Sequence, residues 1–354
     1  MNEFKDITMR RMNHQSSHWV SELVFILGLT LVLAMRGIEP SAASAATSGE
    51  KPKQATVKVI VIDGTQRFPI YVMRTRGIAD KYNLKVEEVP VSGPQAQYTA
   101  MQTGDFQVST TAWFPVVLMR AQGFKFSIVF PVSSYTDDIV VPADSPLKSM
   151  ADLKGKRIGI SGGPASSGTW IFRTEAVRFF GFDPMKEAKV QFGAAPLLTG
   201  LMENNELDAV LIQNPQVVRL LETEKFRSLA SFGDIWREKT GQDVMLVTIV
   251  MNEDWAKANR DIGKRFVAAF KESAEYLKAH AEVWPEIAEQ IGIKTETGAK
   301  LLRERTAKSL LTKWDKKLLD EQYRYGTEVM KIFGDSEGSP KQIPPDTFDM
   351  SFTP

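Results

Sequence analysis

The sequence predicts an α/β protein with two similar lobes, each a mostly parallel sheet flanked by helices, followed by a helical C-terminal region. From Val57 to Met251, short apolar runs rich in β-branched residues alternate with helical stretches, a pattern typical of sheets covered by helices on both faces. Beyond Asp254 nearly all of the chain has helical periodicity. The chain of 354 residues is long enough for two lobes even without residues 1–45.

In the first half of the chain, turn residues separate the predicted elements. Pro69 suits the first turn of a helix, and Pro90 together with Ser92-Gly93-Pro94 ends a strand. The alternation predicts strands at 57–62, 84–89, 106–110, 126–132 and 139–141, and helices at 69–82, 95–103 and 115–122.

The second half continues the alternation. Ser149 and Asp152 have the spacing of a capping box, which starts a short helix that Gly155 ends. The Gly, Ser and Pro residues after Asp335 predict a loop or a loosely packed strap. Strands are predicted at 157–160, 190–192, 209–212 and 244–251, and helices at 167–181, 196–204 and 215–223.

Residues 1–45 have the features of a signal peptide. Arg10 and Arg11 precede an uncharged apolar run, Leu23–Met35, and Ala43-Ser44-Ala45 fits the small-residue pattern of a cleavage site before Ala46. The run is too short to span a bilayer, which needs ~20 apolar residues. We therefore expect export and a periplasmic mature protein, with an uncleaved anchor as the alternative.

Composition narrows the class of function. The 44 Lys and Arg residues balance the 43 Asp and Glu residues, so no basic surface for nucleic acid is indicated. The chain contains 0 cysteines, which excludes a disulfide framework and a lipid anchor. Of its 3 histidines only His280 lies beyond the leader, in a predicted helix. Histidine-based catalysis and a His-rich zinc site are therefore not expected. We predict a monomeric protein that is no enzyme and needs no cofactor or metal.

The segment "SGGPASSGTW" is a Ser/Gly-rich turn between a predicted strand and a helix that starts near Ser167. Such a junction directs backbone N–H groups and the positive end of the helix at one point, which favours an anion. Gly163 and Gly168 have the spacing of a phosphate-binding loop, but Thr169 and Trp170 stand where Lys and Ser or Thr are needed. The loop is predicted to bind a ligand and not to hydrolyse one. Ordinary helix capping is the alternative.

An internal similarity supports two lobes. The segment from Met101 to Val108 leads from a helix end through a turn into a strand and on to Pro115, and the segment from Met202 to Val210 does the same before Pro215. In open α/β sheets, ligands bind at the carboxyl ends of the strands. We therefore expect a cleft between the lobes, with these residues on its two walls: Thr110, Thr111, Ser166–Thr169, Gln213 and Asn214.

Four segments carry a resemblance to a known family: "GIADKYNLKVEEVPVSGP", "MQTGDFQVSTT", "VPADSPLKSMADLKGKRIGI" and "NELDAVLIQNPQ". From about Val57 to Ala288 the chain resembles the periplasmic substrate-binding proteins of ABC importers, in the branch that binds alkanesulfonates, taurine, nitrate and thiamine pyrimidines. The resemblance implies a type II fold of two lobes that close on a ligand. It implies lobe I at 56–139 and 245–330, lobe II at 140–244, a tail at 331–354, and crossings near 139–141 and 243–247.

The resemblance also implies a ligand site made of loops from both lobes. Arg67 is the only arginine in the first-lobe loops and would pair with a sulfonate or carboxylate, unless it is simply an exposed charge. Trp113 would stack on the ligand or else belong to the core. Tyr135 and Asp137 are further candidates. The implied ligand-binding residues are Gln66, Arg67, Ser92, Gly93, Gln95, Thr110, Thr111, Trp113, Ser166, Ser167, Gly168, Thr169, Gln213 and Asn214.

One departure from the family pattern affects the expected ligand. Where many relatives read Trp-Asp-Pro-Tyr, this chain has Gln213-Asn214-Pro215-Gln216, which weakens the inference to a cationic or aromatic amine. We expect a small anionic organic ligand (a sulfonate, a nitrate-like ion or a carboxylate) that is delivered to an ABC permease. The alternatives are a neutral pyrimidine-type ligand, a sensing subunit for a receptor kinase or chemoreceptor, and a pyrimidine-synthesising enzyme. That enzyme class uses His and Cys clusters, which the sequence lacks.

Overall fold

The computed structural model describes residues 54–164, 166–333 and 340–354. The predicted signal peptide lies outside the described residues. No helix within the described ranges is both long enough and apolar enough to cross a membrane.

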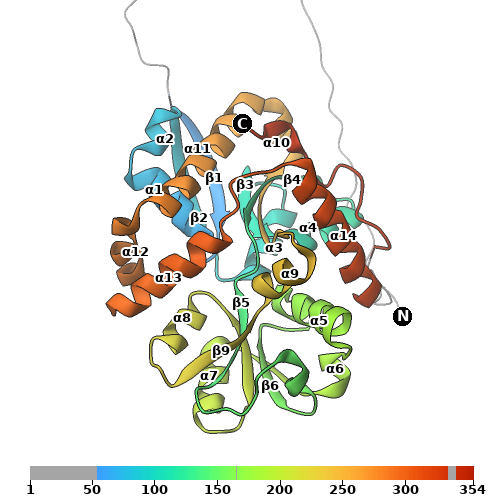
Figure 1. Ribbon diagram of the computed structural model, residues 1–354. Helices are drawn as coiled ribbons and strands as arrows, with labels where there is room; N and C mark the ends of the chain where they lie inside the picture. Colours follow the sequence, from blue (N-terminus) through green and yellow to red (C-terminus); the bar gives the residue numbers. More distant parts are fainter. Residues whose placement is uncertain (1–53, 165, 334–339) are drawn as a thin grey trace, which may run out of the picture. The chain divides into compact units, whose positions relative to one another are not determined.

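The described chain forms two five-stranded sheets with the same plan (Figure 1). Sheet A has the order β2-β1-β3-β10-β4 and sheet B the order β7-β6-β8-β5-β9. We use "lobe I" for the part built on sheet A and "lobe II" for the part built on sheet B. The strands are β1 (Ala55–Val61), β2 (Leu84–Pro90), β3 (Val108–Ala112), β4 (Phe126–Ser133), β5 (Asp137–Pro142), β6 (Arg157–Ser161), β7 (Lys189–Gly193), β8 (Ala209–Gln213), β9 (Phe226–Ser231) and β10 (Val247–Asn252).

In each sheet four strands run in one direction and a single strand runs against them, so the prediction of mostly parallel sheets is confirmed. In sheet A, β1 pairs in parallel with β2 and β3, whereas β10 pairs antiparallel with β3 and β4. Sheet B repeats this, with β6 parallel to β7 and β8, and β5 antiparallel to β8 and β9. The reason is topological: β5 and β10 enter from the other lobe, at the edge where the parallel strands end. The strands β3 and β8, which follow the two similar segments, hold the same place in the two orders, so the predicted repetition of the lobes is confirmed.

Most predicted helices are present, with two differences. The helix expected at 69–82 is two helices, α1 and α2, because Gly77 has a positive φ of 71° that interrupts the helix. The strand β9 and the helices α6 and α9 were not predicted. The α-helices are α1 (Arg67–Thr75), α2 (Ile78–Lys81), α3 (Pro94–Gln102), α4 (Trp113–Ala121), α5 (Ser167–Phe180), α6 (Pro184–Glu187), α7 (Ala195–Glu203), α8 (Gln216–Leu221), α9 (Phe232–Thr240), α10 (Glu253–Ala258), α11 (Arg260–Ala279), α12 (Trp284–Gln290), α13 (Glu296–Ser309) and α14 (Lys316–Phe333).

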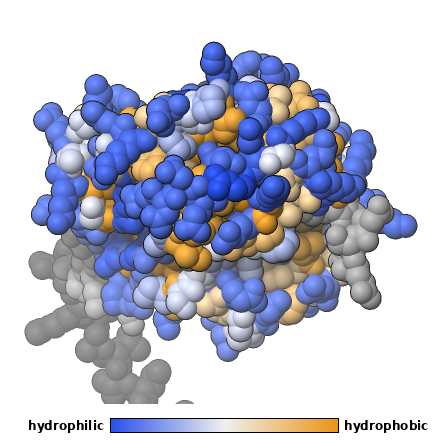
Figure 2. Space-filling view, turned by 90° about the horizontal axis from the view of Figure 1, so that it is seen from below, coloured by the Kyte–Doolittle hydropathy of each residue, from blue (hydrophilic) through white to orange (hydrophobic). Residues whose placement is uncertain are grey.

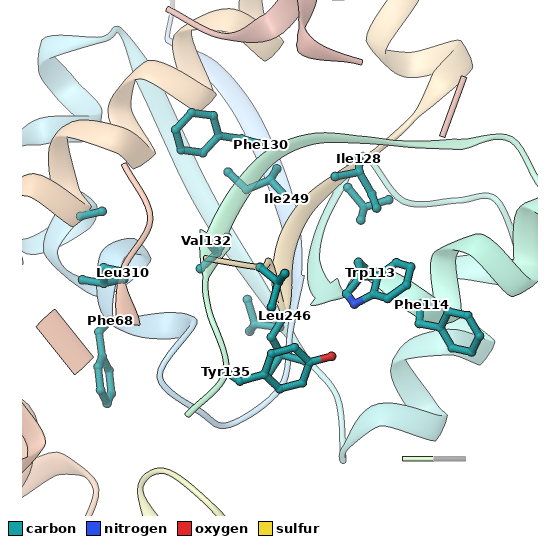
Figure 3. Close-up of a cluster of buried hydrophobic side chains, with 14 of the residues drawn as sticks. Phe68, Trp113, Phe114, Ile128, Phe130, Val132, Tyr135, Leu246, Ile249 and Leu310 are labelled. Carbon is teal, nitrogen blue, oxygen red and sulfur yellow. The ribbon is translucent and has the colours of Figure 1, made fainter. Parts of the chain in front are cut away.

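Two segments connect the sheets. The first, Ser134–Thr136, leads from β4 to β5, and the second, Gly241–Leu246, leads from α9 to β10. The backbone N–H of Leu246 donates to the carbonyl oxygen of Ser133 at 2.8 Å, so the two connections lie side by side. In Figure 3, Leu246 and Tyr135 lie close together at this point.

The C-terminal region packs on both lobes. The helix α13 contacts α12 and the lobe II helix α8, and α14 contacts α5. After α14 the chain returns to lobe I, where the N–H of Ile128 donates to the carbonyl of Thr347 and the N–H of Asp349 donates to the carbonyl of Ile128, both at 2.8 Å. Phe352 is buried. The described end of the tail is thus a strap along β4, as predicted.

The hydrophobic core runs from lobe I into the side of lobe II that α5 covers. It includes Phe130, Ile249 and Trp113 in lobe I (Figure 3), and Ile160 and Phe172 in lobe II. A smaller core fills the opposite side of sheet B, around Val140, Leu198 and Val217. Hydrophilic residues cover most of the face seen from below in Figure 2, with apolar residues between them. The burial of large side chains on both sides of sheet B fixes the position of α5, which carries part of the predicted site.

Candidate ligand-binding site

The Ser/Gly-rich turn forms the start of α5 as predicted. Ser166 is the N-cap, and its Oγ accepts a hydrogen bond from the backbone N–H of Thr169 at 3.4 Å. The Thr169 hydroxyl donates to the carbonyl oxygen of Gly163 at 2.9 Å, so its proton is used within the loop. The N–H groups of Ser167 and Gly168 belong to the first turn of α5, where an α-helix supplies no acceptor.

Gly168 brings the first turn of α5 against sheet B. A Cβ atom at this position would lie 2.7 Å from Cδ2 of Leu211 on β8 and 3.1 Å from Oδ1 of Asp137 on β5. A larger side chain at this position would therefore require the Leu211 and Asp137 side chains to shift. The close approach places the Asp137 carboxylate directly beside the predicted anion-binding turn.

In lobe I, Thr110 and Thr111 lie near the carboxyl end of β3 and are buried. The side-chain amide of Gln97 donates to the carbonyl oxygen of Thr110 at 2.9 Å, whereas Thr110 Oγ1 has no partner among the described residues. Ser92 and Gln95 are exposed around the start of α3, where Gly93 has a φ of 87°. The lobe I candidates thus divide into buried ones on β3 and exposed ones before α3.

Arg67 is held by two carboxylates. Its Nε donates to Glu88 Oε2 at 2.8 Å and its Nη1 to Asp63 Oδ1 at 2.6 Å. Partial burial opposes the charge, but the two acidic partners outweigh it and raise the pKa of Arg67. The neighbouring Gln66 is mostly buried, and its Nε2 lies 3.4 Å from the carbonyl oxygen of Ile62. The charge of Arg67 is thus already balanced by carboxylates of lobe I.

At the end of β8, Gln213 is exposed and Asn214 is buried. Asn214 Oδ1 accepts from Arg305 Nε at 3.1 Å, and Asn214 Nδ2 has no partner in the described part of the chain. Arg305 also donates to Asp138 Oδ1 at 2.5 Å. Burial raises the pKa of Asp138, and Arg305 opposes that rise. Sequence reasoning missed Arg305 because α13 carries no motif that marks it.

Two aromatic residues bring the predicted loops of the two lobes together. Phe114 follows Trp113 at the start of α4, and Trp170 follows Thr169 in α5. Their ring centroids are 4.5 Å apart in an edge-to-face arrangement. Trp113 is 1 % exposed, and its centroid lies 5.7 Å from that of Tyr325, so it packs as a core residue.

Two acids are buried: Asp137 begins β5, directly after the first connection, and Glu175 lies on α5. Asp137 is 2 % exposed, and burial together with the charge of Asp138 raises its pKa to about 7. Glu175 is 0 % exposed, and burial together with the charge of Asp137 raises its pKa well above the usual range. Asp137 Oδ2 and both Glu175 oxygens have no hydrogen-bond partner among the described residues. Sequence reasoning named Asp137 but missed Glu175. The available signal was a charge on the apolar face that Ile171 and Phe172 define.

A comparison with protein families matches residues 64–283 to the model described as NMT1/THI5 like. The chain belongs to the NMT1/THI5-like family. A Haemophilus influenzae protein named for thiamine biosynthesis is 27 % identical over 226 residues, which are 61 % of this chain and 66 % of that protein. The NMT1/THI5-like chain thus spans about 66 % of the length of this curated relative.

Solved structures show the same fold at low identity. The periplasmic aliphatic sulphonate binding protein SsuA of Escherichia coli is 17 % identical with a TM-score of 0.66, over 83 % of this chain and 96 % of that one. The periplasmic nitrate-binding protein NrtA of Synechocystis PCC 6803 is 15 % identical with a TM-score of 0.54, over 70 % and 69 % of the two chains. The NMT1/THI5-like chain therefore has the fold of two-lobe periplasmic binding proteins, and the resemblance inferred from its motifs is confirmed.

Proposed function

We propose that this protein is a periplasmic solute-binding protein that captures a small organic ligand between its two lobes and delivers it to an ABC permease. The observation that carries the proposal is the contact between Phe114 and Trp170 at 4.5 Å. It joins the first turn of α4, directly after β3, to the first turn of α5, which follows β6. The carboxyl ends of strands from both lobes therefore lie toward one region. Ligands of open α/β sheets bind at such strand ends.

The ligand carries an acidic group that binds at the first turn of α5. The N–H groups of Ser167 and Gly168 supply the donors, and the positive end of the 14-residue helix adds to their effect. Each hydrogen bond to a charged group contributes about 1.5–3 kcal/mol. Arg67 joins them only by exchanging one of its two carboxylate partners for the ligand. A neutral pyrimidine is the second candidate, which the amides of Gln213 and Asn214 and the thiamine-related name of the Haemophilus influenzae relative favour.

Binding and closure are tested together on the protein without residues 1–45. Native mass spectrometry first weighs any co-purified ligand, and thermal denaturation then screens sulfonates, nitrate, small carboxylates and pyrimidines. A ligand at a hundredfold excess over Kd adds about 2.7 kcal/mol of stability. X-ray scattering should show a more compact particle with ligand than without. A ligand that binds without compaction would contradict capture by closure.

The anion-binding turn is tested by Ser167→Pro, which removes one N–H. Proline is tolerated at the first position of a helix, and the ψ of 152° at Ser166 suits a residue before proline. Calorimetry should show a tenfold to hundredfold loss of affinity for the acidic ligand. Glu296→Pro makes the same change at the start of α13 and should leave affinity unchanged. Wild-type affinity in Ser167→Pro would place the acidic group elsewhere.

A further inference from the structure

A cavity of about 560 Å³ lies between α12 and α13. The two helices contact each other and are drawn side by side in Figure 1. None of the predicted ligand-binding residues is among the described residues that line the cavity, so it is separate from the site at the first turn of α5. Its volume falls within the range of small-molecule sites, about 300–1,000 Å³. The cavity is therefore large enough for a ligand of its own.

The floor of the cavity is apolar. It is formed by four residues that are at most 8 % exposed: Trp284, Ala288, Ile293 and Ala299. The Trp284 ring lies 6.0 Å from that of Phe68 on α1, between centroids, and its Nε1 donates to the carbonyl oxygen of Leu277 at 3.0 Å. An apolar chain or ring that lies on this floor would lose its contact with water, which favours binding.

The two helices are fixed on different neighbours, so the space between them is preformed. Gly298 of α13 packs against the end of α8, where a Cβ atom on the glycine would lie 2.3 Å from Glu222 Oε2. The Thr295 hydroxyl donates to the same carboxylate at 2.6 Å. On the other wall, an ion pair between Arg76 and Glu286 holds α12 against the end of α1. A site that exists before binding needs little free energy to organise.

Charged side chains surround the floor. They are three cations and two acids, all of them exposed: Lys294, Lys300, Arg303, Glu289 and Glu296. None of the five forms an ion pair with another described residue. Arg303 is the one arginine within the described ranges that has no hydrogen bond, ion pair or ring contact. Because the cations outnumber the acids, the charge around the cavity favours an anion.

The order of charges along α13 makes the two ends of the cavity different. Glu296, Lys300 and Arg303 follow one another at intervals of about one turn, so they lie on one face of the helix. Arg303 is about 10.5 Å further along the helix than Glu296. An acid group is therefore favoured beside Lys300 and Arg303 and disfavoured beside Glu296. The guanidinium of an arginine also presents two parallel N–H donors that match a carboxylate.

We propose that this cavity binds an organic anion that has an apolar chain or ring. Its acid group pairs with Lys300 and Arg303, and its apolar part lies on the floor between α12 and α13. Such binding is independent of solute capture between the lobes, because the two sites share no residue.

The experiment compares three probes that differ only in the head group: octanoate, octanol and octylamine. Calorimetry measures their affinities for the protein without residues 1–45. We expect octanoate to bind about fivefold to tenfold more tightly than octanol, and octylamine to bind most weakly. NMR spectra of alanine methyl groups should show that octanoate shifts the signals of Ala288 and Ala299, which locates it in the cavity.

Two variants test the head-group contacts. Lys300→Gln and Arg303→Gln should each remove most of the preference for octanoate over octanol, and both change exposed residues that the fold does not need. Lys264→Gln is the matched control, because Lys264 is an exposed lysine of α11 that has no ion pair among the described residues and does not line the cavity. It should leave the affinity for octanoate unchanged.

Three results would overturn the proposal. The first is equal affinity for octanoate and octanol, which would show that the cations do not select an anion. The second is octanoate binding without a change in the signals of Ala288 and Ala299, which would place the probe elsewhere, for example between the lobes. The third is the absence of binding by any of the probes. Solute capture between the lobes would stand in all three cases.

Discussion

Replacing Arg305 by methionine tests the ion pair that joins α13 to lobe II. Arg305 lies 2.5 Å from Asp138, which is 0 % exposed. Methionine keeps an apolar stem but removes the positive charge. The Asp138 carboxylate would then keep the hydroxyl of Ser228, at 2.6 Å, as a hydrogen-bond donor. Breaking a buried pair from one side costs about 3–5 kcal/mol. Because the Arg305 side chain is 20 % exposed, we expect a loss near the lower limit.

Urea denaturation followed by circular dichroism measures this loss of unfolding free energy. In thermal denaturation, Tm should fall by about 6 °C for a chain of this size. Arg157→Met is the control, because Arg157 pairs with Asp208 where the two side chains are 44 % and 30 % exposed. Such a surface pair contributes about 0–1 kcal/mol. Adding Asp138→Asn to Arg305→Met should restore part of the stability, since it removes the unpaired charge. Equal losses in Arg305→Met and Arg157→Met would refute the reasoning from burial.

Two further predictions concern Gly168 and Asp137. Gly168→Ala should lower the free energy of unfolding by about 1–3 kcal/mol, because the new methyl group would lie 2.7 Å from Leu211 Cδ2. Gly200→Ala within α7 is the control, since its methyl group meets no atom within 4 Å and should stabilise the protein by about 0.5–1 kcal/mol. Equal changes in their urea midpoints would contradict the packing argument. For Asp137, the folded-state pKa of about 7 lies above the unfolded value, so the folded protein binds more protons and its stability falls as pH rises from about 4 to 7. Asp137→Asn should lessen that fall in urea midpoint, and an unchanged pH dependence would show that Asp137 does not titrate in this range.

The fold was predictable because its signals are local. Three of these signals involve residues close in sequence: the alternation of strands and helices, the capping of the short helix, and the polar loop before α5. In the cap, Asp152 Oδ2 accepts a hydrogen bond from the Ser149 N–H at 2.9 Å. The segment from Phe226 to Ser231 was missed because its partly buried residues do not alternate cleanly with exposed ones. The break at Gly77 was missed because helical periodicity continues on both sides of it.

The site was less predictable because its decisive contacts join distant residues. No spacing in the sequence reveals that Glu88 on β2 occupies the guanidinium of Arg67, or that Arg305 reaches Asp138 from α13. Glu175 was hidden for a different reason, since a single acid on an apolar helix face has no motif. The two contacts show that Arg67 and Asp138 are already paired with other charged groups of the protein.

The helices α13 and α14 contact both lobes. Their contacts with lobe II include Arg305 to Asp138, Thr295 to Glu222, and Glu321 to Trp236. Opening of the lobes must either break these contacts or carry both helices along with lobe II. The Arg305 pair is the costly one to break, because it would leave Asp138 buried and charged. The same region also contacts lobe I, where the N–H of Leu311 donates to the carbonyl oxygen of Val132 at 3.0 Å and Tyr325 packs against Trp113, so a change in the angle between the lobes must break contacts on one side or the other.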